Sequence, residues 1–310
     1  MRFMILATKT MQAIEDALVK DQGNKFRKYL KELYPQAEDI YSQTEQPFRK
    51  HLGASLIGRE CSRELWYSWH WCKAPKFGGR ILRLFNRGHA EEPRFVALLQ
   101  MIGCTVYQFD KNGKQFRIDG HGGHYGGGLD GVAVGIPEYP TEPGLTEFKT
   151  HSEKSFNSVA KEGVQAAKVE HFHQMQQYMG YHKLRFALYM AVNKNTDEIH
   201  AEIILFDPIY FHQYFERAGT IIKSKIPLPK ISNNAKFFKC TFCDFKPICH
   251  GKDVPARNCR TCVYSEAFLE NDNGEWICTN PLSGLNLLSF EQQLKGCDNY
   301  IVNPHIKEPL

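Results

Sequence analysis

Several features that would place the chain in a class at once are missing from its sequence. No apolar run comes near the ~20 residues needed to cross a bilayer, and the apolar stretch at residues 3–7 is too short for a signal peptide. We therefore expect a cytoplasmic protein with no membrane partner. There is no G-x4-G-K-[ST] loop, which argues against an ATP-driven motor within this chain. Internal repeats and low-complexity segments are also missing.

Positively charged residues only slightly outnumber negatively charged ones, 39 to 34. The net charge of +5 and the pI near 8.6 permit a nucleic-acid partner, and they fit an ordinary slightly basic enzyme equally well. With 310 residues, 42% of them hydrophobic, the chain can form one large domain, or one domain with a small appendage.

Cysteine, by contrast, is plentiful, with ten residues. In a reducing compartment, pairs with two residues between them indicate metal binding rather than disulfides. Cys240, Cys243 and Cys249 form a C-x2-C-x5-C run, for which Cys61 is the expected fourth ligand and Cys72 the alternative. Four thiolates of this kind fit a [4Fe–4S] cluster, with zinc as the alternative.

The segment after residue 255 contains a second group of cysteines. Cys259 and Cys262 form a C-x2-C pair typical of a zinc knuckle, and Cys278 and Cys297 follow at looser spacing. We expect these four to bind Zn²⁺, with His305 as a possible replacement for one of them. The alternative is a tail of free thiols that packs on the main domain.

The order of predicted elements indicates an α/β fold with a central mixed sheet flanked by helices. Hydrophobic periodicity predicts helices over residues 9–32, 55–72, 84–101, 153–182 and 208–224. Short apolar stretches between turns predict strands over residues 104–109, 115–118, 129–134, 145–149, 186–192 and 198–206.

Two neighbouring predicted strands carry a carboxylate–lysine group. Glu147 and Lys149 are two residues apart, so on a strand they project from the same face. Asp130 lies in a glycine-rich segment at the start of the preceding strand. Two carboxylates from adjacent strands form an oxygen-rich site suited to Mg²⁺ or Mn²⁺. Lys149 could orient or deprotonate a water there, and bound cations would lower its pKa.

Two predicted helices offer further polar groups. Glu92 could be another metal ligand, and Glu91 or His89 could take its place because all three lie within one turn. Gln174 and Tyr178 are four residues apart and therefore share one helix face. Such a pair can bond a phosphate and hold a lysine in place, although a plain polar helix face would look the same.

Together these segments resemble the PD-(D/E)XK nuclease superfamily, in its RecB-like and phage-exonuclease branch. The resemblance covers roughly residues 50–250 and depends on four motifs in the family's order: Arg87–Pro93, Gly128–Gly131, Glu147–Lys149 and Gln174–Tyr178. It implies a restriction-endonuclease-like core. It also implies that two Mg²⁺ or Mn²⁺ ions are bound by Glu92, Asp130, Glu147 and the carbonyl oxygen of Phe148.

The same resemblance gives the other residues their roles. Lys149 would act on the attacking water, while Gln174 and Tyr178 would support the substrate and the lysine. The cysteine pattern resembles the iron–sulfur clamp of AddAB-type helicase–nucleases and CRISPR-associated RecB-like nucleases. We therefore expect a nuclease domain over residues 1–255, divided into a helical part (1–102), a catalytic core (103–225) and a cluster-ligand segment (226–255), with a zinc-binding tail at 256–310.

The implied activity is a metal-dependent DNA exonuclease, with a 5′→3′ direction favoured, that acts in recombination or repair in a bacterium or a phage-infected cell. A helicase or an annealing protein is a possible partner. The alternatives are a structure-specific flap endonuclease and a non-catalytic DNA-binding subunit. The complete set of Asp130, Glu147 and Lys149 argues against the non-catalytic alternative.

Overall fold

The computed structural model describes residues 4–36, 48–270, 272–284 and 286–307. The chain divides into two compact units, each built from separated segments. Unit 1 comprises Met1–Glu45, Phe77–Ile118 and Gly128–Phe211, and unit 2 comprises Gln46–Lys76, Asp119–Gly127 and His212–Leu310. The boundary predicted after residue 255 falls inside unit 2, so the late cysteines share one unit with Cys61.

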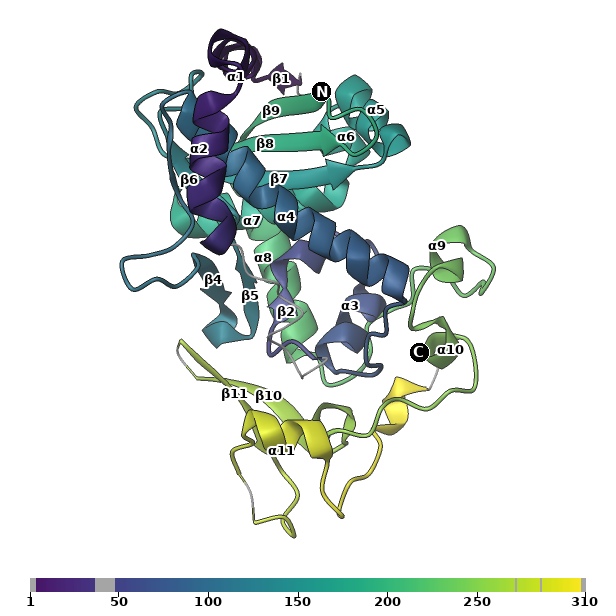
Figure 1. Ribbon diagram of the computed structural model, residues 1–310. Coiled ribbons are helices and arrows are strands. Elements are labelled where there is room, and N and C mark those ends of the chain that lie inside the picture. Colours follow the sequence, from purple (N-terminus) through teal and green to yellow (C-terminus); the bar gives the residue numbers. More distant parts are fainter. Residues whose placement is uncertain (1–3, 37–47, 271, 285, 308–310) are drawn as a thin grey trace. The chain divides into compact units, whose positions relative to one another are not determined.

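Unit 1 is built on a six-stranded mixed sheet with the order β1-β9-β8-β7-β6-β3 (Figure 1). Its central strands β7 and β8 are parallel, and every other neighbouring pair is antiparallel. The bounds are β1 (Ile5–Leu6), β3 (Thr105–Tyr107), β6 (Gly131–Val134), β7 (Gly144–His151), β8 (Phe186–Asn193) and β9 (Ile199–Leu205). The predicted mixed sheet is thus confirmed.

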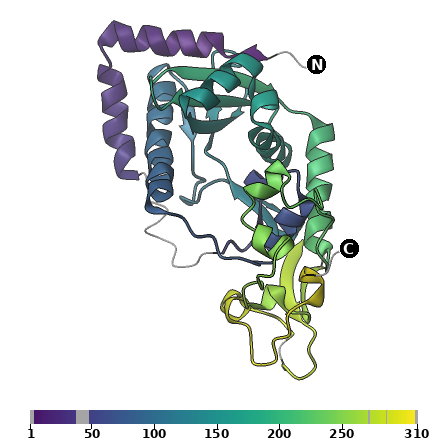
Figure 2. The same cartoon turned by 90° about the vertical axis from the view of Figure 1, so that its right-hand side faces the viewer.

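Helices cover both faces of this sheet (Figure 2). One side holds α1 (Thr8–Asp21), α2 (Asn24–Leu33) and α4 (Gly79–Met101), and the other holds α5 (Glu153–Glu162), α6 (Val164–Ala167) and α7 (Val169–His182). The single helix predicted over residues 9–32 is wrong, because Gln22 and Gly23 take the left-handed conformation, with φ of 53° and 73°, and break it in two. Apolar side chains of α4, β7 and β8 form much of the core.

Unit 2 contains the cysteine-rich segments and short elements. They are β2 (Leu52–Gly53), α3 (Ser62–Trp69), α9 (Phe238–Thr241), α10 (Lys246–Cys249), β10 (Ser265–Glu270), β11 (Asn273–Cys278) and α11 (Phe290–Lys295). The chain passes between the units within β4 (Arg117–Gly120), β5 (Tyr125–Gly128) and α8 (Pro208–Lys223). The helix predicted over residues 55–72 is wrong in its first half, since α3 begins only at Ser62 and Cys61 directly precedes it.

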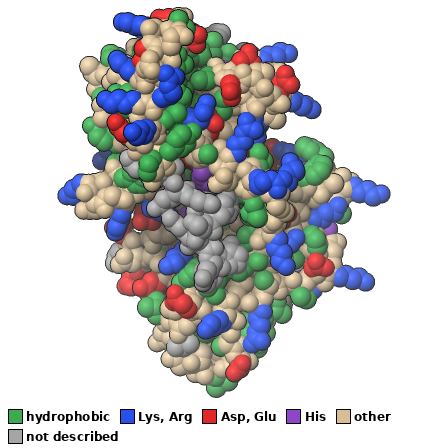
Figure 3. All heavy atoms as spheres, in the orientation of Figure 1, with side chains coloured by type: hydrophobic (Ala, Val, Ile, Leu, Met, Phe, Trp, Pro, Cys, Tyr) green, Lys and Arg blue, Asp and Glu red, His purple; other side chains and the backbone are tan. Residues whose placement is uncertain are grey.

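The described part of the chain has no helix with the length and apolar character to span a bilayer. On the face shown in Figure 3, lysine and arginine side chains are scattered among acidic ones and form no single basic field. Local groups of charge are therefore more informative than the total net charge.

Candidate functional site

Strand β7 carries Glu147 and Lys149 on one face. Phe148 between them turns to the other face and stacks on Phe95 of α4, with ring centroids 5.0 Å apart. The Glu147 side chain is fully buried. Lys149 Nζ donates a hydrogen bond to Glu147 Oε1 and another, of 3.2 Å, to the carbonyl oxygen of Phe148. The two charged side chains therefore form a direct ion pair inside the fold.

Asp130 joins this pair from the neighbouring strand. It directly precedes β6, in which Gly131 pairs with Thr146 of β7 in antiparallel register. Its Oδ2 atom accepts a 2.8 Å hydrogen bond from the Phe148 amide and lies 3.9 Å from Lys149 Nζ. The predicted approach of the two carboxylates from adjacent strands is thus explained by the strand pairing.

The three charges strongly affect one another. Burial and the nearby Glu147 carboxylate raise the pKa of Asp130 to about 8, against the opposing effect of Lys149. Burial also raises the pKa of Glu147. For Lys149, burial lowers the pKa, but Glu147 and Asp130 outweigh it and raise the pKa above its ordinary value. With only the protein's own groups around it, Lys149 is therefore a charged ammonium. The lowered pKa of Lys149 that we expect from the sequence would require the positive charge of bound cations.

Helix α4 brings Glu92 to the same place. The charge of Glu92 contributes to the raised pKa values of both Asp130 and Glu147. Its carboxylate lies 3.3 Å from His89, and both side chains are about one-third exposed, at 32%. Glu91 instead pairs with Arg94 at 2.9 Å. Of the three candidates on this turn, Glu92 is therefore the best placed to act with the strand carboxylates.

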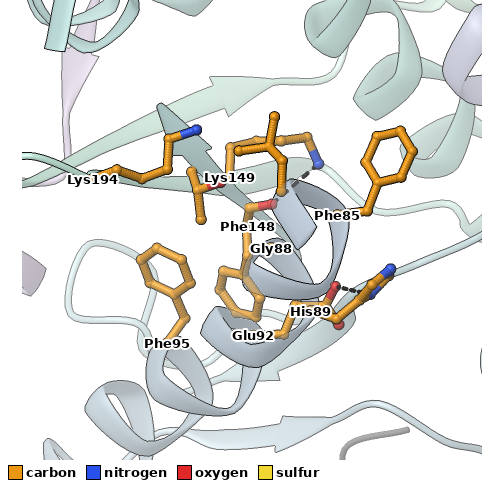
Figure 4. Close-up of a pocket in the computed structure, with 10 residues that line it drawn as sticks. Phe85, Gly88, His89, Glu92, Phe95, Phe148, Lys149 and Lys194 are labelled. Carbon is orange, nitrogen blue, oxygen red and sulfur yellow. Dashed lines mark hydrogen bonds and ion pairs between the residues drawn. The ribbon is translucent and has the colours of Figure 1, made fainter. Parts of the chain in front are cut away.

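Lys149 and Glu92 line a cavity of about 320 Å³, whereas Asp130 and Glu147 are not among the residues that line it. Figure 4 shows Glu92 and His89 of α4 on one side and Phe148 and Lys149 of β7 on the other. Lys194, next to the end of β8, also lines it. The cavity thus combines acidic and basic side chains with an aromatic wall.

The carboxylates fit a hard divalent cation in one specific respect. Glu147 Oε2 is buried without a hydrogen-bond partner, and such an oxygen is costly unless a cation or donor satisfies it. Across the described residues, no group of three or more His, Cys, Asp or Glu side chains lies where it could hold a metal ion. The ammonium of Lys149 lies against both strand carboxylates and offsets part of their charge.

The predicted polar pair on α7 is buried. Gln174 Nε2 donates to the Tyr178 hydroxyl at 3.4 Å, and the side chains are 8% and 2% exposed. Helix α7 packs against β7 and β8. A plain solvated helix face is therefore excluded for these two residues, while their predicted support of the substrate stays a prediction.

Sequence reasoning missed a polar network that continues along β7. His151 projects on the Glu147 face and bonds the Tyr189 hydroxyl at 2.7 Å, and His171 of α7 bonds the same hydroxyl at 3.1 Å. Burial is the main cause that lowers the pKa of His151 to about 4 and of His171 to about 2, so both rings are neutral. The i, i+2, i+4 spacing of Glu147, Lys149 and His151 was the available signal.

In unit 2, the four cysteines predicted to hold a cluster lie close enough to affect one another. Burial raises the pKa of Cys240, Cys243 and Cys249, and the Cys61 sulfur adds to the rise in each case. Cys72 is fully buried, and burial is the cause of its own raised pKa. The choice of Cys61 over Cys72 as the remote member of the group stays a prediction.

The four cysteines of the tail also meet, in a second and separate group. Cys259, Cys262, Cys278 and Cys297 line one small cavity. His305 is exposed and is not among the residues that line it.

The aromatic residues around the C-x2-C-x5-C run divide into two kinds. Phe245 is buried and packs near Tyr67, with ring centroids 5.6 Å apart. Phe238 and Phe242 are 62% and 85% exposed, and the Lys239 ammonium lies 5.5 Å from the Phe238 ring centroid. From the sequence, these rings could equally pack in the core or stack on bases. In the structure Phe245 packs in the interior, whereas Phe238 and Phe242 are accessible to solvent.

No protein-family model and no curated protein matches the chain. Among solved structures it is similar to the alkaline exonuclease LHK-Exo from Laribacter hongkongensis, with a TM-score of 0.40 and 13% identity over 56% of this chain and 86% of that one. LHK-Exo in complex with dAMP gives the same values. SSO0001 has a TM-score of 0.37 and 15% identity over 75% of this chain and 100% of that one. Similarity at this level does not support an assignment of function, which has to be argued from the chain's own side chains.

Proposed function

We propose that the chain is a metal-dependent deoxyribonuclease that hydrolyses phosphodiester bonds at DNA ends. The observation that carries this proposal is the group of Asp130, Glu147 and Lys149, in which Lys149 lines a cavity and one oxygen of the buried Glu147 is unsatisfied. Two buried carboxylates beside each other cost stability even with one ammonium against them, and such costly groups are typical of functional sites.

Glu92, Asp130, Glu147 and the Phe148 carbonyl oxygen would hold two Mg²⁺ or Mn²⁺ ions. When bound, these ions neutralise the phosphoryl charge, lower the pKa of water and stabilise the leaving oxygen. Lys149 has its pKa raised by its carboxylate neighbours, so it would orient the attacking water as an ammonium and give up a proton only once cations offset those neighbours. Gln174 and Tyr178 would keep this region in place from α7.

The substrate would reach the site through the cavity. Lys194 lines it, and Arg87 donates a 3.0 Å hydrogen bond to the Lys194 carbonyl oxygen, so two cations lie near one rim. They can contact phosphates without reading sequence. In unit 2, the exposed Phe238 and Phe242 can stack on unpaired bases.

A [4Fe–4S] cluster held by Cys61, Cys240, Cys243 and Cys249 is part of the proposal. The Cys61 sulfur lies close enough to affect each cysteine of the run, and this proximity supports the cluster. The cluster would tie residue 61 to the segment near 245, a loop of most of the chain, and so stabilise unit 2.

Digestion of end-labelled linear DNA with Mn²⁺ tests the proposal. We expect the parent protein to release nucleotides, Glu147→Ala to lose at least ~100-fold in rate, and the exposed control Glu153→Ala to match the parent. Equal cleavage by Glu147→Ala that still binds DNA would refute the catalytic assignment. Comparing 5′ and 3′ labels tests the proposed 5′→3′ direction, and cutting of circular single-stranded DNA would favour the flap-endonuclease alternative.

A further inference from the structure

The cysteines of the tail line a cavity whose size and composition suit one metal ion. Its volume is about 10 Å³, close to the ~10–15 Å³ that a single water-sized sphere needs. Apart from the four cysteines, the residues that line it are uncharged.

The four sulfurs come from three separate segments. Cys259 and Cys262 lie on one short turn, closed by a 2.9 Å hydrogen bond from the Cys262 amide to the Cys259 carbonyl oxygen. Cys278 is the last residue of β11 and pairs with Ser265 of β10. Cys297 follows α11. An ion bound to all four would therefore join the turn, the hairpin and the segment after α11.

The turn between Cys259 and Cys262 is already fixed without the ion's help. Arg260 is 3% exposed, and its guanidinium carbon lies 4.4, 3.7 and 4.6 Å from the ring centroids of Trp69, Trp71 and Trp276. It also donates to the carbonyl oxygens of Trp69 at 3.1 Å and Lys50 at 2.8 Å. This cage positions the turn that carries the first two sulfurs, which lowers the ordering cost of metal binding.

We propose that Cys259, Cys262, Cys278 and Cys297 bind one Zn²⁺ as four thiolates, and that Arg260 positions the first pair. Zinc takes four thiolates in a tetrahedral structural site, with no ligand left open for water. The site is structural, lies apart from the carboxylates of unit 1 in sequence and composition, and does not depend on the proposed nuclease activity.

Metal analysis of the full-length protein tests this proposal. Native mass spectrometry and plasma emission should find one zinc per chain in the parent protein. Cys259→Ser and Cys278→Ser should each lower zinc by at least tenfold and leave iron unchanged. Cys104→Ser is the matched control, because that sulfur is buried in unit 1 and donates to the Gly135 carbonyl oxygen, and it should retain all the zinc.

A second variant keeps the test valid if a cysteine variant misfolds. Arg260→Lys leaves all four sulfurs in place and removes the planar contacts, so we expect zinc to bind with at least tenfold lower affinity in competition with a chromogenic chelator. Parent protein that carries no zinc, or that carries iron at these four positions, overturns the proposal. Equal zinc affinity in Arg260→Lys overturns the positioning role alone.

Discussion

The replacement Asp130→Asn should stabilise the protein while it removes the nuclease activity. Asp130 has a pKa of about 8 in the folded protein, against 3.8 as its ordinary value, because of burial and of Glu147. The folded state therefore holds the proton more tightly than the unfolded state does. Protonated Asp130 therefore contributes its full stabilisation below pH ~4. This contribution decreases as the pH rises from ~4 and is lost above pH ~8. An asparagine has no such charge and can still accept the Phe148 hydrogen bond.

The magnitude follows from the same pKa. A rise of this size corresponds to roughly 6 kcal/mol, at about 1.4 kcal/mol per tenfold change in proton affinity. Lys149 would lose one of its two carboxylate neighbours, which offsets much of that gain. We expect a net stabilisation of about 1–3 kcal/mol at pH 9 and nearly none at pH 4.

Urea unfolding at pH 4, 7 and 9, without added divalent metal, measures this effect. The exposed Asp197→Asn in the turn after β8 is the control and should not change stability by more than ~0.5 kcal/mol. Added Mn²⁺ should stabilise the parent protein and have little effect on Asp130→Asn. If Asp130→Asn is no more stable than the parent at pH 9, the description of the site as a cluster of repelling buried carboxylates is wrong.

Three further predictions concern other parts of the chain. Tyr189→Phe removes the hydroxyl shared by His151 and His171 and should cost about 1–3 kcal/mol in urea unfolding; an unchanged midpoint would contradict this. Phe242→Ala should weaken binding to single-stranded DNA by about 1–3 kcal/mol in fluorescence anisotropy, while Phe268→Ala, also exposed, should not; equal affinities would exclude stacking by Phe242. Cys61→Ser should lose the broad visible absorption of an iron–sulfur cluster and Cys72→Ser should keep it; the reverse pattern would exchange their roles.

Much of unit 1 could be predicted from its sequence, because the spacing of apolar residues along the chain indicates which side chains are buried. The strand predicted over residues 186–192 is a continuous apolar run, and it forms β8 at the centre of the sheet. The break at Gln22 and Gly23 was missed, because the apolar spacing continues across it and only the glycine signals a turn.

The site was predictable in part. Glu147 and Lys149 could be paired from their spacing, since a strand fixes which side chains share a face. The hydrogen bonds that His151 and His171 make to the Tyr189 hydroxyl could not be predicted. They depend on the register of β7 against β8, which places Tyr189 opposite Glu147. The hairpin of β10 and β11 was also missed, because cysteine and charged residues interrupt its alternation.

The most direct test of the central claim is a crystal structure of the protein with Mn²⁺ and a short single-stranded DNA, with anomalous scattering recorded for manganese. We expect anomalous peaks in contact with Asp130, Glu147 and the Phe148 carbonyl oxygen, and a phosphate of the DNA beside Lys149. Manganese bound elsewhere, with Lys149 still closing the space between the two carboxylates, would contradict the assignment.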